Sequence, residues 1–289
     1  MENMKPFVDS ADAIDKPEVL RERMARDGYL FISGLLPAAP LREVYDAIMA
    51  ICQKAEWADG NGKAIGRPKP EGDPEYWDVY GAVQKLECFH ALAHRPELIK
   101  TIAALVQDDV LVHPRNIARI SPPNATKFTT PPHQDFVLIQ ATPETYTGWF
   151  PLTDTPIERG GLAVLAGSHK LGLLPIHKAD GPGGIGVDTD SLGLEWHTQA
   201  FNAGDVLVFH SVTVHKALPN VTADGIRLSV DYRYQGVSQP IVHDGLDPHY
   251  NLAGWPTIYR GWEDNELKYY WRKFKLTVVP RDPSLLETH

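Results

Sequence analysis

The 289-residue chain is poor in cysteine and short of positive charge. It has only two cysteines, Cys52 and Cys88, and both lie in apolar patterns typical of helices. Two isolated thiols of this kind are expected to be free, as in proteins of a reduced cytosol. With 28 basic against 37 acidic residues, the net charge of −9 disfavours nucleic-acid binding, which needs a clustered basic surface.

Long hydrophobic runs are also missing. No apolar stretch approaches the roughly 20 residues that span a bilayer, so no membrane association is expected. The first six residues have neither the basic leader nor the apolar core of a secretory signal. A cytoplasmic location is therefore the default expectation. No Gly-rich loop follows a predicted strand, which argues against a dinucleotide-binding or P-loop fold.

Hydrophobic periodicity predicts that the first third of the chain is mainly helical. A helix is expected over residues 17–27, and a short buried strand over residues 29–32 follows it. Residues 40–54 and a segment that begins near Pro96 have the apolar spacing of amphipathic helices. Between them, residues 55–79 are rich in Gly, Pro and Asp and predict a long surface loop.

The spacing of hydrophobic residues changes near residue 110, where short β-like runs separated by turn residues begin. These runs cover residues 116–120, 136–140, 147–152, 162–166, 205–209 and 226–234. Many short strands after a helical part predict a mainly β, α+β fold of the sandwich or barrel type. They argue against alternating βαβ units.

Two segments differ from their surroundings in composition. The long connection over residues 173–198 contains the Gly-rich run 181–186, which is typical of either a substrate lid or a plain insertion. Residues 263–276 carry aromatic side chains among lysines and an arginine. A nucleobase-stacking patch has this composition, but the helical spacing favours a helix that docks on the rest of the protein.

A His-x-Asp triplet, His133-Gln134-Asp135, is the first candidate for metal binding. Such a triplet is expected about once by chance in a chain with 12 histidines, so its setting decides its value. An apolar run follows it at residues 136–139, which predicts that the triplet lies on a strand. Residues i and i+2 of a strand share one face. His133 and Asp135 are therefore expected to point toward the same metal ion.

The third ligand must come from a distant strand, and two histidines compete for this role. His210 and His215 are five residues apart, so an unbroken strand would place them on opposite faces. We prefer His215, because it precedes a turn-forming Leu-Pro-Asn sequence. Two imidazoles and one carboxylate leave three coordination positions open, which is the facial triad typical of iron(II) oxygenases.

A candidate anion clamp lies twelve residues after His215, at the start of the run over residues 226–234. Alternation places the side chains of Arg227, Ser229, Asp231 and Arg233 on one face and apolar side chains on the other. Arg227 and Ser229 together provide a guanidinium fork and a hydroxyl donor for a carboxylate. The distal carboxylate of 2-oxoglutarate fits such a clamp. The alternative interpretation is a polar strand edge that faces solvent.

Several motifs occur together in a familiar order. They are His133-Gln-Asp135, the run over residues 158–170, the run from Gly204-Asp205 to Pro219-Asn220, and Arg227-Leu-Ser229, preceded by the run over residues 27–36. This series resembles the phytanoyl-CoA dioxygenase family over about residues 17–235. The resemblance implies a double-stranded β-helix (jelly-roll, cupin-like) core with N-terminal helices packed against it. It also implies Fe(II), a 2-oxoglutarate cosubstrate and O2.

The same resemblance implies roles for individual residues. His133, Asp135 and His215 correspond to the catalytic iron ligands, and Arg227 corresponds to the carboxylate anchor. Trp149 matches an aromatic residue beside the cosubstrate. We expect one oxygenase domain over residues 1–289, with a mainly helical part over 1–109, the jelly-roll core over 110–240 and a C-terminal extension over 241–289.

The expected activity is a dioxygenase that hydroxylates, or otherwise oxidises, an unactivated C–H bond of a small molecule and releases succinate and CO2. The retained Asp135 carboxylate argues against halogenation, and the acidic charge argues against a CoA thioester substrate. Arg119, Lys127, Gln140 and the segment around residues 176–187 are candidate substrate contacts. Two alternatives stay open: a cupin-like metalloenzyme without 2-oxoglutarate, and a non-catalytic jelly-roll binding protein.

Overall fold

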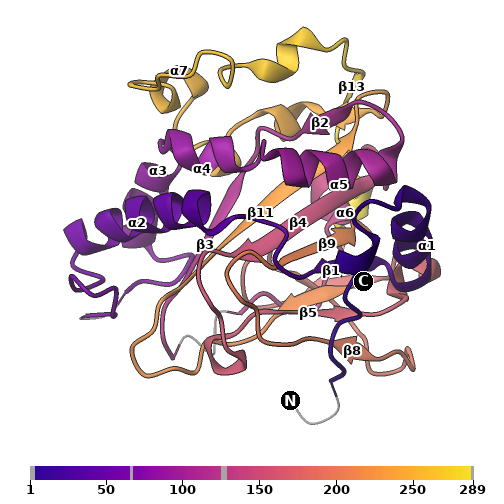
Figure 1. The fold of residues 1–289 in the computed structure, drawn as a ribbon, viewed down its shortest axis with the longest axis horizontal. Helices are drawn as coiled ribbons and strands as arrows, with labels where there is room; N and C mark the ends of the chain where they lie inside the picture. The colour runs from indigo at the N-terminus through magenta and orange to yellow at the C-terminus, as the bar shows by residue number, and fades with distance from the viewer. Residues whose placement is uncertain (1–3, 66–67, 125–128, 288–289) are drawn as a thin grey trace.

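The described part of the protein has two main β-sheets, two small two-stranded pairs, and a layer of helices on one side (Figure 1). The structure is a computed structural model that describes residues 4–65, 68–124 and 129–287. The α-helices are α1 (Pro17–Asp27), α2 (Ala38–Lys54), α3 (Pro74–Val83), α4 (Glu87–Leu92), α5 (Pro96–Val106), α6 (Phe136–Ile139) and α7 (Trp255–Ile258). The strands are β1 (Tyr29–Ile32), β2 (Val110–Val112), β3 (Ile117–Ser121), β4 (Thr145–Pro151), β5 (Leu162–Leu165), β6 (Ile176–Lys178), β7 (Ile185–Val187), β8 (Trp196–His197), β9 (Val206–His210), β10 (His215–Ala217), β11 (Arg227–Gly236), β12 (Ile241–Val242) and β13 (Val278–Val279).

The sheets have jelly-roll topology. The major sheet has the order β1-β9-β4-β11-β2, and β3 also pairs with β11. The minor sheet has the order β10-β5-β8, and every pairing in both sheets is antiparallel. Neighbours in the major sheet are distant in sequence, since β1 pairs with β9 and β4 pairs with β11. The predicted mainly β fold with a jelly-roll core and packed helices is confirmed.

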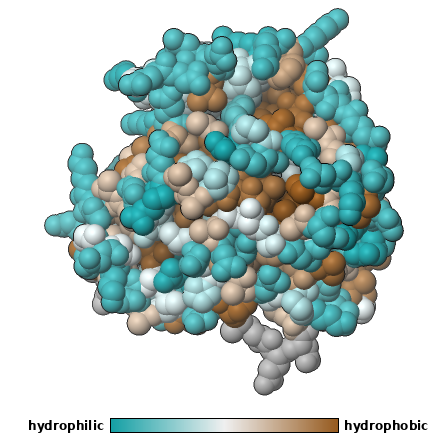
Figure 2. Space-filling model, in the orientation of Figure 1, coloured by the Kyte–Doolittle hydropathy of each residue, from teal (hydrophilic) through white to brown (hydrophobic). Residues whose placement is uncertain are grey.

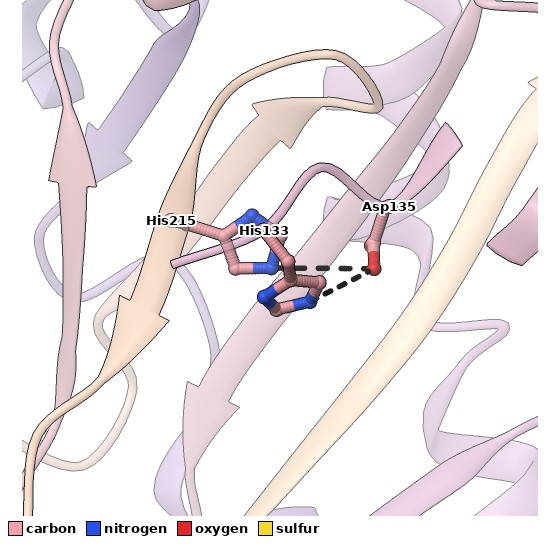
Figure 3. Close-up of side chains that lie close together, drawn as sticks. All are labelled: His133, Asp135 and His215. Atoms are coloured by element: carbon pink, nitrogen blue, oxygen red, sulfur yellow. Dashed lines mark ion pairs between the residues drawn. The ribbon is translucent and has the colours of Figure 1, made fainter. Parts of the chain in front are cut away.

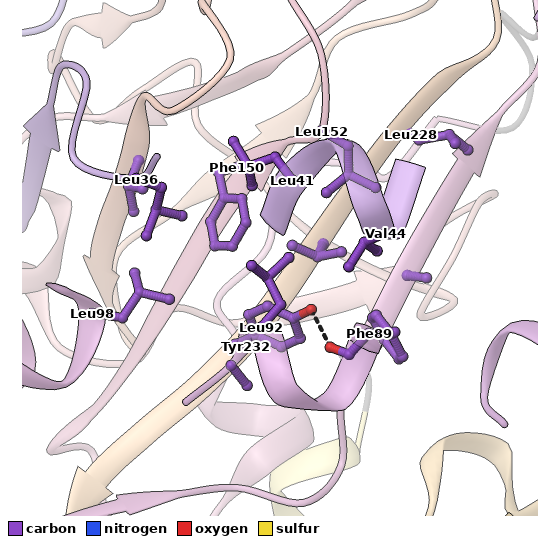
Figure 4. Close-up of a cluster of buried hydrophobic side chains, with 14 of the residues drawn as sticks. Leu36, Leu41, Val44, Phe89, Leu92, Leu98, Phe150, Leu152, Leu228 and Tyr232 are labelled. Atoms are coloured by element: carbon purple, nitrogen blue, oxygen red, sulfur yellow. Dashed lines mark hydrogen bonds between the residues drawn. The ribbon is translucent and has the colours of Figure 1, made fainter. Parts of the chain in front are cut away.

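Strand β11 separates the hydrophobic core from the interior of the jelly roll. Its apolar face, with Leu228, Val230, Tyr232 and Tyr234, packs against helices α2 to α5 in the largest buried cluster (Figure 4). The two tyrosine hydroxyls extend through this layer and donate hydrogen bonds to backbone carbonyls in and just after α4, with Tyr232 bonded to Phe89 at 2.6 Å. The opposite face of β11, which carries Arg227, is also buried. A solvent-facing polar edge is therefore excluded.

Helix α1 ends at Gly28, whose left-handed backbone (φ +78°) allows the chain to enter β1 directly. The Gly28 carbonyl accepts hydrogen bonds from the amide of His210 and the hydroxyl of Thr213. The end of α1 thus anchors the turn between β9 and β10.

Replacing Gly28 with alanine is expected to destabilise the protein by more than about 1 kcal/mol, because the left-handed backbone disfavours any Cβ. That Cβ would also lie 2.7 Å from Thr213 Oγ1 and would collide with His169. Gly34→Ala is the matched control, because Gly34 has a positive φ but no atom within 4 Å of the added Cβ. Equilibrium urea unfolding measures both, and equal losses would show that packing around Gly28 contributes nothing.

Three predicted elements are wrong. Residues 136–140 form the short helix α6 instead of a strand. The predicted loop over residues 55–79 ends earlier, because Asp73 caps the N-terminus of α3 by accepting a hydrogen bond from the amide of Glu75. Residues 263–276 pack on the protein through the buried Trp271, but they contain only the 3-10 turn Tyr270–Lys273 and no α-helix.

The connection over residues 173–198 is more ordered than either predicted alternative. It contains the hairpin β6–β7 and the strand β8. Ile176, Ile185 and Val187 of the hairpin are buried in a cluster with Leu165 of β5 and Val214. The hairpin is therefore packed against the minor sheet.

Both cysteines are free, as predicted, with Cys52 buried and Cys88 partly buried. None of the helices in the described residues has both the length and the apolar character that a membrane span requires. On the face seen in Figure 2, hydrophilic residues predominate and apolar residues show between the C-terminal segment and the helices below it.

Candidate metal centre

Three side chains from two segments of the chain, residues 133–135 and the start of β10, converge in the interior of the jelly roll. His133, Asp135 and His215 are all buried, and one ligand atom from each lies within 4.8 Å of the others (Figure 3). Oδ1 of Asp135 lies 3.7 Å from Nε2 of His133 and 4.0 Å from Nε2 of His215. Within the described residues, this is the only cluster of three or more His, Cys, Asp or Glu side chains that is compact enough for one metal ion.

Both imidazoles are oriented by the backbone. Nδ1 of His133 lies 2.9 Å from the carbonyl oxygen of Pro131, and Nδ1 of His215 lies 3.1 Å from that of Thr213. A carbonyl accepts a hydrogen bond only from a protonated Nδ1, so each Nε2 keeps its lone pair for a metal ion. Burial also lowers the pKa of His215 to about 3, which keeps its ring neutral. Neutral imidazoles are the form in which histidine binds metals.

The carboxylate of Asp135 is fixed from its other side. The Thr147 hydroxyl donates a hydrogen bond to Oδ2 at 2.6 Å, and Nη2 of Arg233 donates to Oδ1 at 3.2 Å. Thr147 of β4 and Arg233 of β11 are directly paired neighbours in the sheet, and both side chains therefore reach the carboxylate of Asp135. Burial by itself would raise the pKa of Asp135, but the neighbouring Arg233 guanidinium holds that pKa well below its usual range.

The cluster forms for a different reason from the one that the sequence suggests. His133 and His215 pair through two backbone hydrogen bonds, and Asp135 then begins the first turn of α6 with helical backbone angles. The side chains of His133 and Asp135 therefore both point inward because the chain turns after His133, and not because the two residues share one face of a strand. The preference for His215 over His210 holds. His210 lies at the end of β9 with its Nε2 3.7 Å from Glu144 and is no part of the cluster.

Two cavities meet at the cluster. The inner cavity lies between the sheets and is lined by the three cluster residues together with Arg227, Trp149 and Thr147. The larger outer cavity opens beside His133 and Asp135. Arg119 and Thr130 line both cavities. A small molecule in each cavity would thus reach the same metal ion.

Arg227 is a buried cation with unused hydrogen-bonding capacity. Its Nη1 donates to the carbonyl of Gly160 at 2.7 Å, whereas its buried Nε has no partner among the described residues. Burial lowers the pKa of Arg227 to about 10, so the side chain is still charged at neutral pH. The hydroxyl of Ser229 and Oδ1 of Asp231 are likewise buried without a partner. Unsatisfied buried donors of this kind are costly and indicate a ligand.

The residues fit a mononuclear metal and a dicarboxylic cosubstrate. Two neutral imidazoles and one carboxylate supply three donor atoms on one side of a metal ion. The same cavity holds a protonated guanidinium whose donors match a carboxylate. Trp149, which packs against Phe201 with ring centroids 4.8 Å apart, adds an apolar side chain to the wall of the same cavity.

The other sequence-based candidates have different outcomes. Arg119 lines both cavities, where it is paired with Glu71 and Asp231. Lys127 lies outside the described residues. Gln140 is buried, and its amide group is bonded to the backbone of Val137 and Asp282, so a substrate contact by Gln140 is not supported. In the Gly-rich segment, Pro182 and Gly183 line the outer cavity.

Several site residues escaped prediction from the sequence. Alternation placed Arg233 on the correct face of β11, but only the register with β4 reveals its contact with Asp135 and that of Thr147. Much of the outer cavity wall comes from the C-terminal extension, through β12, His249, Tyr250 and Arg281. These residues lie in irregular segments, where no periodicity predicts their position.

The jelly roll and the buried cluster of two histidines and one aspartate define a class, the mononuclear non-haem iron oxygenases. The chain belongs to the phytanoyl-CoA dioxygenase (PhyH) family, whose profile matches residues 24–229. It is accordingly an Fe(II)- and 2-oxoglutarate-dependent oxygenase that consumes O2.

Characterised relatives agree with this assignment. A 1-deoxypentalenic acid 11-beta-hydroxylase of Streptomyces exfoliatus is 27% identical over 273 residues, covering 88% of this chain and 92% of the relative. The fold is similar to that of the epimerase SnoN from nogalamycin biosynthesis, solved with Fe3+ and alpha ketoglutarate (TM-score 0.58, 23% identity, 78% of this chain and 86% of that one). The carbocyclase SnoK is also similar (TM-score 0.57, 21% identity, 83% and 91% covered).

Both alternatives from the sequence are thereby set aside. A metalloenzyme without 2-oxoglutarate and a non-catalytic binding protein each conflict with membership of this family. The solved structures include an epimerase and a carbocyclase as well as monooxygenases, so the fold supports several oxidations.

Thr147→Val is expected to weaken Fe(II) binding by roughly 10- to 100-fold, the cost of losing an outer partner of a metal ligand. The change keeps the shape of the side chain and removes the hydroxyl that bonds Asp135. Thr145→Val is the matched control, because Thr145 lies on the same strand and its hydroxyl donates to the carbonyl of Thr142. Anaerobic iron titration compares the variants, and equal affinities would contradict a role for Thr147.

Proposed function

We propose that this protein hydroxylates an unactivated C–H bond of a small-molecule substrate, with Fe(II) held by His133, Asp135 and His215. The observation that carries the proposal is the meeting of two cavities at this cluster. The inner cavity accommodates the cosubstrate, and the outer cavity accommodates the molecule to be oxidised. In the overall reaction, substrate, 2-oxoglutarate and O2 give hydroxylated product, succinate and CO2.

The bound metal and cosubstrate supply the oxidising chemistry. The residues of the protein orient the groups that would bind the metal and the cosubstrate. The carbonyls of Pro131 and Thr213 fix the direction of the two imidazoles, and Thr147 and Arg233 fix the carboxylate of Asp135. His133, Asp135 and His215 would hold the metal ion where the two cavities meet.

Arg227 anchors the distal carboxylate of 2-oxoglutarate in this proposal. Its unpartnered Nε is a donor for that carboxylate, and the buried hydroxyl of Ser229, two residues along the same strand face, also has no partner among the described residues. The apolar side chains of Trp149, Leu162 and Phe209 line the same cavity and limit the access of water. Exclusion of water strengthens the ion pair with Arg227 and protects the reactive centre.

Hydroxylation is favoured over halogenation because Asp135 occupies the coordination position that a halide would need. It is favoured over epimerisation and ring closure because the hydroxylase relative covers nearly the whole chain at the highest identity among the relatives described above. Small molecules are the substrates named for these relatives. A substrate of this kind matches the outer cavity, which is concave and whose wall surface is mainly apolar.

Product analysis tests the type of reaction. Purified enzyme is incubated with Fe(II), 2-oxoglutarate and a panel of small apolar metabolites, and succinate release identifies those that are turned over. Mass spectrometry under isotopically labelled O2 is expected to show a product heavier by one labelled oxygen atom. A product of unchanged mass would indicate epimerisation, and a product that has lost two hydrogens would indicate desaturation or ring closure. Either result would overturn hydroxylation.

A further inference from the structure

The outer cavity has an unbalanced distribution of charge. Four arginines line it, and three of them are paired with acidic side chains. Arg119 pairs with Glu71 and Asp231, Arg233 pairs with Asp135, and Arg281 pairs with Asp244. Within the described ranges, the fourth, Arg115, has no carboxylate within ion-pair distance, although the chain as a whole carries a net charge of −9.

Arg115 is held in place but not neutralised. Its Nη1 donates to the carbonyl oxygens of Asp244 at 2.9 Å and of Pro248 at 3.5 Å. These bonds leave its Nε and Nη2 groups without a hydrogen bond to any described residue, while the side chain lines the cavity. Burial, together with the nearby Arg233 and Arg281, lowers the pKa of Arg115 despite the proximity of Asp244. Arg115 is thus a cation on the cavity wall whose Nε and Nη2 donors no described residue uses.

The rest of the cavity wall suits an apolar molecule. Six aliphatic side chains from four separate elements line it: Ile117, Leu138, Ile139, Ile241, Val242 and Leu286. The two wall histidines outside the metal cluster add no charge, because burial lowers the pKa of His113 to about 4 and that of His249 well below its usual value. Arg115 is a cation with two free donor groups in a wall whose surface is mainly apolar and whose other arginines are already paired with acids, so it suits a ligand with one negative group.

We propose that the substrate is an apolar small molecule with a single carboxylate, which Arg115 binds while the apolar body lies between α6 and β12. A guanidinium with two free donor groups on one edge binds a carboxylate bidentately. The substrate is then held at its acidic end, and its hydrocarbon part is presented to the metal centre at His133 and Asp135. This inference rests on the proposed function, because it assigns the outer cavity to the substrate.

A coenzyme A thioester fits this cavity less well. Conversion to a thioester removes the free carboxylate that would pair with Arg115. The nucleotide part would bring several phosphates, and the other three lining arginines are already paired with acidic residues. The free acid is therefore the form that the charges favour.

The test uses the anaerobic Fe(II)–2-oxoglutarate holoenzyme and calorimetric binding of a defined panel. The probes are linear, bicyclic and tricyclic monocarboxylic acids, including 1-deoxypentalenic acid, each beside its methyl ester and its coenzyme A thioester. At least one acid is expected to bind more tightly than its ester and thioester. Arg115→Met is expected to lower the affinity of the enzyme for that acid by roughly 10- to 100-fold, because a charged hydrogen bond is lost. Binding of the ester should not change.

Two further variants make the result interpretable. Arg115→Gln keeps a donor for the carbonyls of Asp244 and Pro248 but loses the charge, so it should lose acid binding as the Met variant does. Arg42→Met removes an exposed arginine of α2 and should leave acid binding unchanged. Equal acid binding by wild type and the Arg115 variants, or no acid preference, would overturn this inference alone. Absence of the visible iron–2-oxoglutarate absorption band in the wild type would instead overturn the proposed function.

Discussion

His215→Ala is expected to abolish iron binding and, with it, all succinate formation. His215 supplies one of only three protein donor atoms in the buried cluster, and no other histidine lies close enough to replace it within the described residues. The loss of Fe(II) affinity should exceed the roughly 100-fold that removal of an outer partner can cost. Anaerobic iron titration and succinate release measure the two effects.

The chain offers a matched control in His210→Ala. His210 precedes His215 by five residues and contacts Glu144 and Tyr146 away from the cluster. The control should bind iron like the wild type. Thermal unfolding adds a second readout, because Fe(II) with 2-oxoglutarate should raise the Tm of the wild type and of the control but not of His215→Ala. Loss of iron in the His210 variant, with retention in the His215 variant, would contradict the assigned ligand set.

Arg227→Met is expected to weaken 2-oxoglutarate binding by between about 30-fold and about 5,000-fold, while iron binding is unchanged. Truncating one partner of a buried, hydrogen-bonded charge pair costs roughly 2–5 kcal/mol. Arg227 meets this description, because it is fully buried and retains a free Nε toward the cavity that it lines. Titration of the cosubstrate into the anaerobic Fe(II) enzyme measures its affinity.

Two other substitutions separate charge from geometry. Arg227→Lys keeps the charge without the guanidinium fork and should bind 2-oxoglutarate with intermediate affinity. Arg159→Met is the matched control, because Arg159 also has a buried Nε without a partner but does not line the inner cavity. Its affinity for 2-oxoglutarate should equal that of the wild type. An Arg227→Met enzyme with wild-type affinity would mean that the cosubstrate is anchored elsewhere.

The sequence predicts best where one pattern extends over a whole element. The alternation over residues 226–234 assigns both faces of β11 correctly, since a long buried strand must separate apolar from polar side chains. The apolar spacing of residues 17–27 and 40–54 predicts α1 and α2 because each helix buries one continuous stripe. The order of His133, Asp135, His215 and Arg227 then indicates the metal centre.

Prediction fails where contacts between distant segments decide the conformation. Phe136–Ile139 has four apolar residues, which suit a strand or a helical turn equally well. A hydrogen bond from the amide of Phe136 to the carbonyl of the distant Ser211 fixes the start of the turn. No hydrophobic pattern in the sequence predicts that Arg115 lies beside the C-terminal wall of the outer cavity. Their proximity depends on carbonyls of residues 244 and 248, which follow Arg115 by well over a hundred residues.

The most direct test of the metal and cosubstrate assignment is an anaerobic titration of the purified protein with Fe(II) and then 2-oxoglutarate. If His133, Asp135 and His215 hold the metal and Arg227 anchors the cosubstrate in the same cavity, a weak visible charge-transfer band should develop and saturate at one iron per chain. The band should be missing in His215→Ala and should need far more 2-oxoglutarate in Arg227→Met. A wild-type protein that binds iron but develops no band, or a band that survives in His215→Ala, would contradict the assignment.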